Sequence, residues 1–252
     1  MSKSIAEIKK EFEERMPEQW AELYQEYAED ERAGVRSLIA RYQKQEEALR
    51  QERLRLESMK MYERQYAECS YICGIDEAGR GPLAGPVVAG AVILPKDCEI
   101  LYLNDSKKLS AKKREVLYDE IMEKAVAVGI GMASPARIDE INILQATYEA
   151  MRSAIAQLGV IPDILLNDAV TIPQVTIPQV PIIKGDAKSV SIAAASIMAK
   201  VTRDRLMKEY DAVMPQYGFA SHKGYGSAAH IDAIRKYGPS PIHRRSFIGN
   251  FL

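Results

Sequence analysis

Residues 71–94, YICGIDEAGRGPLAGPVVAGAVIL, decide the fold because they combine two apolar runs with a glycine-rich turn and a pair of acids. Runs rich in Ile and Val that are bounded by Gly and Pro are typical of buried β-strands. The first run ends in Asp76 and Glu77, whose side chains point to opposite faces of a sheet. Unless the strand ends there, one carboxylate is buried and needs a cation, because an unpaired buried charge costs several kcal/mol.

On the N-terminal side of this stretch the sequence has almost no glycine and is rich in helix formers. Ser4 and Glu7 form a capping-box pattern that predicts the start of a helix, and apolar residues recur at helical spacing after it. Gly34 is expected to end one helical segment before the next begins. We predict a helical extension over residues 1–70, either packing on the main domain or touching a nucleic-acid backbone through its basic part, residues 32–64.

On the C-terminal side the pattern changes to alternating strands and helices, which indicates an α/β domain over residues 71–252 with a helical C-terminal part. Five segments rich in Ile, Val and Leu are predicted strands: 71–77, 87–94, 125–133, 164–168 and 181–184. Ser134 and Pro135 predict a helix start and Gly159 a helix end. A second helix is expected over 191–210, packed closely on the sheet through its alanines. The repeat TIPQVTIPQV (171–180) is expected to be an extended loop or edge segment.

The bulk composition is that of an ordinary globular protein, with 47% hydrophobic and 27% charged residues in 252. A net charge of -1 argues against general coating of nucleic acid but permits a local basic groove. There is no apolar run of membrane-spanning length and no signal-peptide core at the N-terminus, so no membrane is expected. The three cysteines lack CxxC spacing, which favours reduced thiols and a cytoplasmic location.

Two further acids follow apolar runs in the same way as Asp76 and Glu77. Asp168 ends one predicted strand, and Asp186 follows another just ahead of a long helix, where it could also be a simple helix cap. Acids at the ends of several strands can converge on one edge of an α/β sheet. Carboxylate oxygens suit Mg²⁺ or Mn²⁺ better than zinc. Two such ions about 4 Å apart activate a water and stabilise the leaving oxygen in phosphodiester hydrolysis.

The triplet Gly79-Arg80-Gly81 lies directly after the first acid pair and matches neither a P-loop nor a dinucleotide fingerprint. It is compatible with a plain turn between two strands. Its position beside the acids also allows the glycine backbone to approach a ligand closely, and a sugar 2′-hydroxyl both donates and accepts hydrogen bonds. Arg80 could contact a neighbouring phosphate.

Five motifs in order identify a family resemblance: GIDEAGRGPLAGPVVAGAVIL (74–94), LNDSKKLS (103–110), KGDAKSVSIAAASIMAKVTRD (184–204), HKGYG (222–226) and HRRSF (243–247). Together they resemble bacterial ribonuclease HII over residues 71–247. The resemblance implies a ribonuclease H-like fold, a mixed five-stranded sheet flanked by helices. It implies cleavage of the RNA strand of RNA–DNA hybrids, and of DNA duplexes 5′ to an embedded ribonucleotide, leaving 3′-hydroxyl and 5′-phosphate ends. Repair of such ribonucleotides and removal of RNA primers are the implied roles.

The resemblance also implies site residues. The catalytic and metal-binding set is Asp76, Glu77, Asp168 and Asp186, holding two divalent ions, Mg²⁺ or Mn²⁺, with Asp76 bridging them. Gly79, Arg80 and Gly81 are implied to read the 2′-hydroxyl of the ribonucleotide. Tyr225 is implied to stack on the sugar of the following deoxynucleotide, so that the junction itself is recognised.

Several polar residues near these motifs are secondary candidates. Ser106, Lys107 and Lys108 are suited to gripping phosphates near the cut, or form only a polar loop before the helix that Ser110 begins. Lys184 is a further substrate-binding candidate. The three histidines, His222, His230 and His243, are expected to be structural or to contact backbone, whereas Arg244 and Arg245 are expected to add positive charge to a duplex-binding face. Asn167, beside Asp168, needs hydrogen-bond partners if it is buried, at a cost of roughly 1–3 kcal/mol otherwise.

There are three alternatives to this hypothesis, one of them a related enzyme. A ribonuclease HIII-like enzyme, which needs RNA tracts, is disfavoured by the intact Gly79-Arg80-Gly81 triplet and the helical N-terminus. A non-catalytic hybrid-binding protein gains nothing from four carboxylates pointed at phosphates. A nucleotide enzyme lacks its phosphate loop. We expect a monomer, and the sequence identifies no protein partner.

Overall fold

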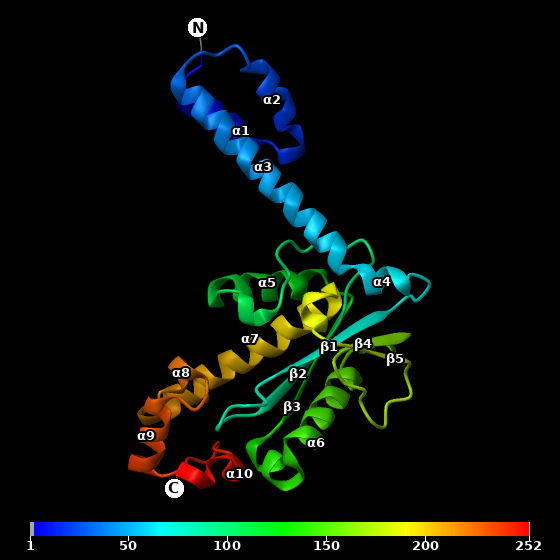
Figure 1. Cartoon of the computed structure of the whole chain (residues 1–252), viewed down its shortest axis with the longest axis vertical. Coiled ribbons are helices and arrows are strands. Elements are labelled where there is room, and N and C mark those ends of the chain that lie inside the picture. The colour runs from blue at the N-terminus through cyan, green and yellow to red at the C-terminus, as the bar shows by residue number, and fades with distance from the viewer. Residues whose placement is uncertain (1–2, 252) are drawn as a thin grey trace. The chain divides into compact units, whose positions relative to one another are not determined.

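The computed structural model describes residues 3–251 and contains two compact units, one ending at Glu57 and the other beginning at Ser58 (Figure 1). The division falls inside the long helix α3 (Ala33–Met59). The boundary that composition predicts at residue 70 stays a prediction. Each unit is built around its own buried side chains and is described separately.

The N-terminal unit is helical, as predicted, and contains α1 (Ile5–Glu14), the short 3-10 helix η1 (Pro17–Gln19), α2 (Trp20–Glu26) and most of α3. The predicted capping box is confirmed: the Ser4 amide donates to Glu7 and the Glu7 amide to the Ser4 hydroxyl. Aromatic rings fill the core, and Phe12 stacks on Tyr42 with centroids 4.3 Å apart. The expected break at Gly34 is wrong. Gly34 lies in the first turn of α3, where a Cβ would meet the Ile5 side chain at 2.3 Å, so its role is close helix packing.

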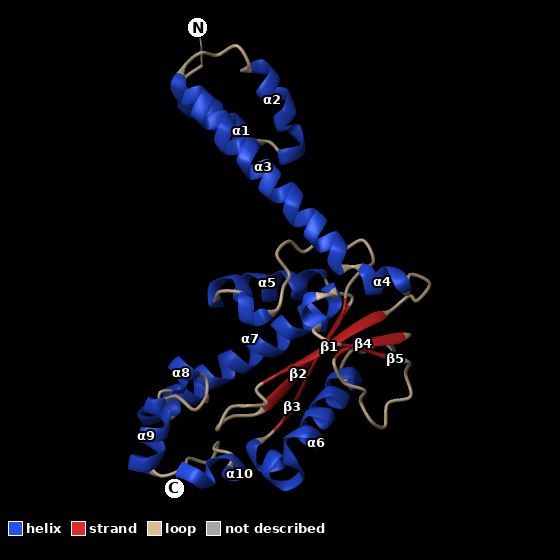
Figure 2. Ribbon diagram, in the orientation of Figure 1, coloured by secondary structure: helices blue, strands red, loops and turns tan. Residues whose placement is uncertain are grey.

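The second unit contains a five-stranded sheet with the order β3-β2-β1-β4-β5 (Figure 2). Its strands are β1 (Ile72–Ala78), β2 (Val87–Ile93), β3 (Ala127–Ala133), β4 (Ile164–Asp168) and β5 (Gln179–Ile182). Its α-helices are α4 (Met61–Gln65), α5 (Ala111–Lys124), α6 (Pro135–Ala156), α7 (Val190–Val213), α8 (Phe219–His222), α9 (Ala228–Tyr237) and α10 (Arg245–Ile248). Four 3-10 helices join them: η2 (Ser106–Lys108), η3 (Gly185–Ala187), η4 (Pro215–Tyr217) and η5 (Gly249–Phe251). The sheet is mixed, as predicted, because β1, β2 and β3 pair antiparallel whereas β1, β4 and β5 pair parallel.

Helices α6 and α7 cover opposite faces of the sheet, as Figure 1 shows, and glycines in the strands let both approach closely. A Cβ at Gly74 would meet the backbone of Ser191 in α7 at 2.0 Å, and one at Gly90 would meet the Ala195 carbonyl at 2.4 Å. The alanine-rich start of α7 therefore packs on the sheet as predicted. The predicted helix start at Ser134 is also confirmed, since its hydroxyl accepts from the Arg137 amide.

The last strand differs from the predicted range 181–184. Strand β5 is Gln179–Ile182, and Lys184 takes a left-handed conformation (φ 58°) that ends the strand direction. Most of the TIPQV repeat is loop, and its last two residues enter β5 at the edge of the sheet. Within residues 3–251, no helix is both long and apolar enough to cross a membrane.

Candidate active site

The four predicted acids lie at one end of the sheet because of the strand order. Strands β1 and β4 are parallel neighbours with Ile75 opposite Asn167, so the next residue of each, Asp76 and Asp168, reaches the same edge. The Asp168 carboxylate accepts a hydrogen bond of 2.7 Å from the Gly185 amide, and this contact brings η3 with Asp186 to that edge. The alternative role of Asp186 as the cap of α7 is excluded, because Ser189 is the N-cap residue.

Burial shifts the pKa values of three of these acids, Asp76, Glu77 and Asp186, in the same direction. Burial raises the pKa of Asp76 well above its ordinary value, and repulsion from Glu77 and then Asp168 adds to the shift. Burial also raises the pKa of Glu77, against the lowering effect of Arg80. The pKa of Asp186 is raised by burial first and then by Asp105 and Asp168. Neutral carboxyls are favoured wherever no cation compensates them, so the site has the charge imbalance that a bound cation corrects.

The donor chemistry fits a hard divalent cation, since all four side chains offer carboxylate oxygens. Each carboxyl also has a protein partner: Asp76 accepts from the Glu77 amide at 2.7 Å, and Glu77 lies 3.4 Å from Arg80. Across the described part of the chain, no three Asp, Glu, His or Cys side chains are gathered as closely as a bound ion requires. Ion binding would therefore accompany side-chain rotation at this edge.

The loop 104–108 supplies a residue that sequence reasoning missed. The Asp105 carboxylate accepts from the Lys107 amide at 2.9 Å and shares a hydrogen bond with the Asp186 carboxyl. Its signal was available, since it is an acid inside the motif LNDSKKLS. Burial alone would lower the pKa of Lys107, but Asp105, Asp76 and Asp186 together raise it. Lys107 therefore lies in the field of the acids and partly offsets their charge.

The other phosphate-gripping candidates differ in their exposure. Ser106 is buried, and its hydroxyl lies 2.9 Å from that of Ser196, which in turn hydrogen-bonds Asp76. Lys108 and Lys184 are exposed. The phosphate contacts predicted for Ser106, Lys107, Lys108 and Lys184 stay predictions.

The Gly79-Arg80-Gly81 turn is held from below by Arg244, which donates to the carbonyls of Gly79 (2.5 Å), Arg80 (2.7 Å) and Gly85 (2.9 Å). The expectation that Arg244 adds charge to a duplex-binding face is wrong, because its side chain is fully buried. Burial lowers the pKa of Arg244 to about 9. The three carbonyls replace the hydrogen bonds that the Arg244 guanidinium would make to water. A sequence motif does not predict that these carbonyls, distant in the chain, meet one side chain.

A second buried arginine, Arg203 of α7, links the segment that follows this turn to the loop that carries Tyr225. Its guanidinium donates to the carbonyls of Pro86 (3.0 Å), Ala84 (3.0 Å) and Lys223 (2.9 Å). The Leu83 amide also donates to the Gly224 carbonyl at 2.8 Å. The segment that follows the glycine turn and the loop that carries Tyr225 are thus joined by hydrogen bonds. Tyr225 itself is 45% exposed, and Lys200 Nζ and Arg203 Cζ lie 5.8 and 6.0 Å from its ring centroid.

Three histidines support the same loop from the other side, and they contact backbone as predicted. His243 Nδ1 accepts from the Ser240 amide, so its Nε2 donates to His230 Nε2 at 3.0 Å, and His230 Nδ1 donates to the Tyr225 carbonyl at 2.9 Å. Burial lowers the pKa of His230 and of His243 to about 4. His222 stacks on His230 with centroids 4.3 Å apart. This chain of neutral rings requires one tautomer at each position.

Asn167 is fully buried, and its amide group donates to the Val170 carbonyl (3.1 Å) and to Gln179 (2.8 Å). Gln179 belongs to the second TIPQV copy and also exchanges hydrogen bonds with the Ile172 backbone. The pair fixes the loop after β4 to the edge strand. The Asn167 Oδ1 atom has no hydrogen-bond partner in the protein. The expectation that a buried Asn167 needs partners is therefore met for its amide nitrogen and not for its oxygen.

This mixed sheet with α6 and α7 on its faces and clustered acids at one edge defines a ribonuclease H-like nuclease. The sequence matches the family model of ribonuclease HII over residues 73–250 and that of the ribonuclease HII N-terminal domain over residues 4–67. The chain belongs to the ribonuclease HII family, and it is therefore a ribonuclease H endonuclease of a family that depends on divalent metal and acts on RNA–DNA hybrids.

Curated relatives and solved structures agree with this assignment. The chain is 67% identical to ribonuclease HII of Lachnoclostridium phytofermentans, over 99% of this chain and 98% of that protein. It is 52% identical to ribonuclease HII of Clostridioides difficile, over 99% of each. Ribonuclease H2 of Pyrococcus horikoshii superposes with a TM-score of 0.59 at 28% identity, covering 70% of this chain and 93% of that one.

Proposed function

We propose that this endonuclease cuts RNA–DNA hybrids and also cuts duplex DNA 5′ to a single embedded ribonucleotide, leaving 3′-hydroxyl and 5′-phosphate ends. The observation that carries the second activity is the connection that Arg203 makes between the segment after the Gly79-Arg80-Gly81 turn, at the carbonyls of Ala84 and Pro86, and the Tyr225 loop, at the Lys223 carbonyl. A single ribonucleotide presents one 2′-hydroxyl beside one deoxyribose. An enzyme that reads both needs its two recognition elements at a fixed separation.

Asp76, Glu77, Asp168 and Asp186 are the proposed ligands of two divalent ions, Mg²⁺ or Mn²⁺, and Asp76 is the most buried of them. Bound there, such ions would activate a water and stabilise the leaving oxygen. The burial of Asp76 and the raised pKa values of Asp76, Glu77 and Asp186 support this role, because a cation removes the repulsion that burial intensifies. Lys107 is proposed to neutralise part of the charge near the scissile phosphate.

The turn is proposed to read the 2′-hydroxyl with the groups that Arg244 leaves free. Because the carbonyls of Gly79 and Arg80 accept from Arg244, the amides of the turn and the Gly81 carbonyl are the available readers. A Cβ at Gly81 would meet no protein atom within 4 Å, so packing does not require glycine there. Close approach of a ligand explains it.

The test is cleavage of a DNA duplex with one internal ribonucleotide beside an RNA–DNA hybrid, with Mg²⁺, Mn²⁺ or chelator. We expect a metal-dependent cut directly 5′ to the lone ribonucleotide, and no cut when its 2′-hydroxyl is replaced by hydrogen. Cutting of the long hybrid alone would move the chain to the tract-requiring type. Cutting of the all-DNA control would remove the proposed role of the Gly79-Arg80-Gly81 turn.

A further inference from the structure

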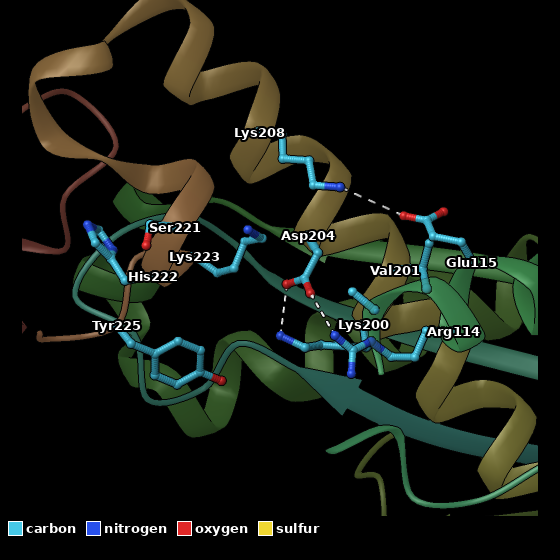
Figure 3. A pocket seen from close by; sticks show the side chains of 11 residues that line it. Arg114, Glu115, Lys200, Val201, Asp204, Lys208, Ser221, His222, Lys223 and Tyr225 are labelled. Atoms are coloured by element: carbon cyan, nitrogen blue, oxygen red, sulfur yellow. Dashed lines mark hydrogen bonds and ion pairs between the residues drawn. The ribbon is translucent and has the colours of Figure 1, made fainter. Parts of the chain in front are cut away.

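A cavity of about 380 Å³ lies between α5, α7 and the loop after α8 (Figure 3), and none of the four candidate metal-binding acids lines it. Four cationic residues line it, Arg114, Lys200, Lys208 and Lys223, together with the acids Glu115 and Asp204. Figure 3 shows Lys200, Asp204 and Lys208 projecting from α7, with Tyr225 on the adjacent loop. The lining therefore has an excess of positive charge in a chain whose net charge is -1.

The cations of this cavity are crowded. Burial lowers the pKa of Lys223, and although Asp204 opposes that shift, Lys208 and Lys200 lower it further. Asp204 is shared between Lys200 at 2.8 Å and Arg114 at 3.8 Å, so one carboxylate serves two cations. Lys208 lies 4.0 Å from Glu115, which Arg205 already holds at 2.6 Å. An anion entering the cavity would relieve repulsion that the two acids leave uncompensated.

The position of the cavity relates it to the substrate strand. Ser196 of α7 hydrogen-bonds Asp76, and Lys200 and Lys208 follow it on the same helix. At about 1.5 Å per residue they lie roughly 6 and 18 Å farther along α7. One strand of a duplex presents a phosphate about every 3.4 Å of its axis, so a strand that runs along α7 would bring phosphates a few nucleotides from the cut to these lysines.

The wall of the cavity indicates which strand it binds. Tyr225 lines it, and Lys200 Nζ lies 5.8 Å from the centroid of the Tyr225 ring. Tyr225 is proposed to stack on the deoxyribose that follows the ribonucleotide. A phosphate attached to that sugar or to the next one therefore lies beside the cavity.

We propose that this cavity is a phosphate-binding site for the cleaved strand on the 3′ side of the ribonucleotide, with Lys200 and Lys208 as its principal cations. The inference rests on the proposed function for the placement of Tyr225. A phosphate bound in this cavity would hold the DNA on the 3′ side of the ribonucleotide and so position the RNA–DNA junction at the four acids. Phosphate contacts fix register without reading sequence, which suits an enzyme that must act on ribonucleotides in any context.

The experiment measures binding of the full chain in chelator to a duplex with one ribonucleotide, with backbone phosphates replaced one at a time by neutral methylphosphonates. For the wild type, we expect neutralising one phosphate 3′ of the ribonucleotide to weaken binding about tenfold. In Lys200→Gln that penalty should disappear while penalties at other positions persist, since both changes remove the same contact. The slope of the logarithm of the binding constant against the logarithm of salt concentration should be smaller by about one for Lys200→Gln than for the wild type.

Lys208→Gln and Glu115→Gln are expected to change substrate binding in opposite directions. Both side chains lie at the rim and are 55% and 35% exposed, so neither variant should unfold the protein, and thermal melting checks this. Lys208→Gln should weaken binding about threefold to fivefold and Glu115→Gln should strengthen it about twofold, because the first removes a cation and the second removes an acid. Lys236→Gln on exposed α9 is the control with the same change in net charge.

Three results would overturn the site: equal effects of Lys200→Gln and Lys236→Gln, a flat methylphosphonate map, or a sensitive phosphate on the complementary strand. Its failure is distinguishable from failure of the proposed function, because binding in chelator does not require cleavage. A protein that leaves the lone ribonucleotide uncut but needs one particular phosphate 3′ of the cut in a hybrid would keep the site and lose the function. Normal cutting at the lone ribonucleotide together with a flat methylphosphonate map would keep the proposed function and exclude the site.

Discussion

The acid edge and the two recognition loops, both proposed to contact substrate, handle buried charge in opposite ways. At the acid edge, burial and mutual repulsion raise the pKa values of Asp76, Glu77 and Asp186, and their nearby cations offset only part of the charge. Under the loops, Arg203 and Arg244 are buried without a carboxylate within ion-pair distance among the described residues. Each guanidinium instead donates to three backbone carbonyls.

The difference shows what each region is built for. Uncompensated carboxylates form a site whose energetics improve when a cation arrives. Satisfied guanidinium and imidazole groups form a rigid support, because each loses several hydrogen bonds if the loop moves. The first region is poised for ion binding, whereas the second fixes a separation between two loops. Variants in the two regions should therefore fail differently.

Asp76→Asn is expected to have the largest effect on activity. It should reduce cleavage at least about 1,000-fold, since it removes the central charge of the acid edge. It should leave hybrid binding in chelator nearly unchanged and should stabilise the metal-free protein by about 1 kcal/mol, because a buried carboxylate with a raised pKa disfavours folding at neutral pH. Single-turnover cleavage and urea unfolding measure both quantities. Retained turnover would contradict the role of Asp76.

Arg244→Lys tests the support. A lysine at this position reaches fewer of the carbonyls of Gly79, Arg80 and Gly85, so the free energy of unfolding should fall by about 2–4 kcal/mol. Cleavage at a lone ribonucleotide should decrease more than cleavage of a long hybrid, because the hybrid offers many registers. Exposed Arg245→Lys is the matched control. Equal loss on both substrates would show that Arg244 only stabilises the fold.

Gly79→Ala and Gly81→Ala separate packing from ligand approach within one turn. At Gly79 the φ angle is +91° and a Cβ would meet Arg203 at 2.1 Å, so stability should fall by about 2 kcal/mol. At Gly81 a Cβ would meet no protein atom within 4 Å, so stability should be nearly unchanged while cleavage falls about tenfold or more. Melting temperatures and cleavage rates of both variants distinguish a packing role of the glycine from a role in ligand approach. Full activity of a stable Gly81→Ala would exclude close backbone approach.

The two regions should also respond oppositely to pH. Because burial lowers the pKa of His230 and of His243 from 6.5 to about 4, the stability that they provide is lost as pH falls through that window. Because the pKa of Asp76 is raised above 3.8, protonating it as pH falls restores stability. As pH falls from 7, Asp76→Asn should therefore lose more stability than the wild type, measured by urea unfolding in chelator. Parallel pH curves would contradict this.

Removal of the N-terminal unit should have the smallest effect on both regions, provided that the truncation leaves the second unit, residues 58–252, intact. Glu63 of α4 accepts from the Ser189 hydroxyl (2.6 Å) and the Ser191 amide (3.0 Å) at the start of α7. A chain of residues 58–252 keeps this contact, and we expect an unchanged cleavage rate with binding weakened a few-fold. A chain of residues 67–252 loses it and should be about 2 kcal/mol less stable. Loss of cleavage by the longer chain would show that the N-terminal unit acts in catalysis.

Much of the fold could be predicted from local pattern. Strands β1 and β4 were predicted to within one residue at each end, since their apolar runs and terminal acids are local signals. The last strand was misplaced because β5 forms by pairing with β4 at a sheet edge, where Pro181 and exposed residues weaken the pattern. Gly34 was misinterpreted because its helix tolerates glycine in exchange for close packing on Ile5.

The candidate site divides in the same way. Asp76, Glu77, Asp168 and Asp186 could be proposed from sequence because each carboxylate ends or follows an apolar run, and strand ends can meet at one edge of an α/β sheet. Arg203, Arg244 and the order of the histidine chain were not found, since an arginine in a sequence normally indicates a surface. Their burial depends on carbonyls contributed by segments more than 100 residues away.

The sequence alone therefore determined the family of this protein, and it contains the carboxylates and the glycine turn on which the proposed chemistry depends. The tertiary structure alone decided which charges are exposed to ligands and which support the backbone. The physical reason is that a residue's type fixes what it can donate or accept, whereas its burial and its partners depend on the whole chain.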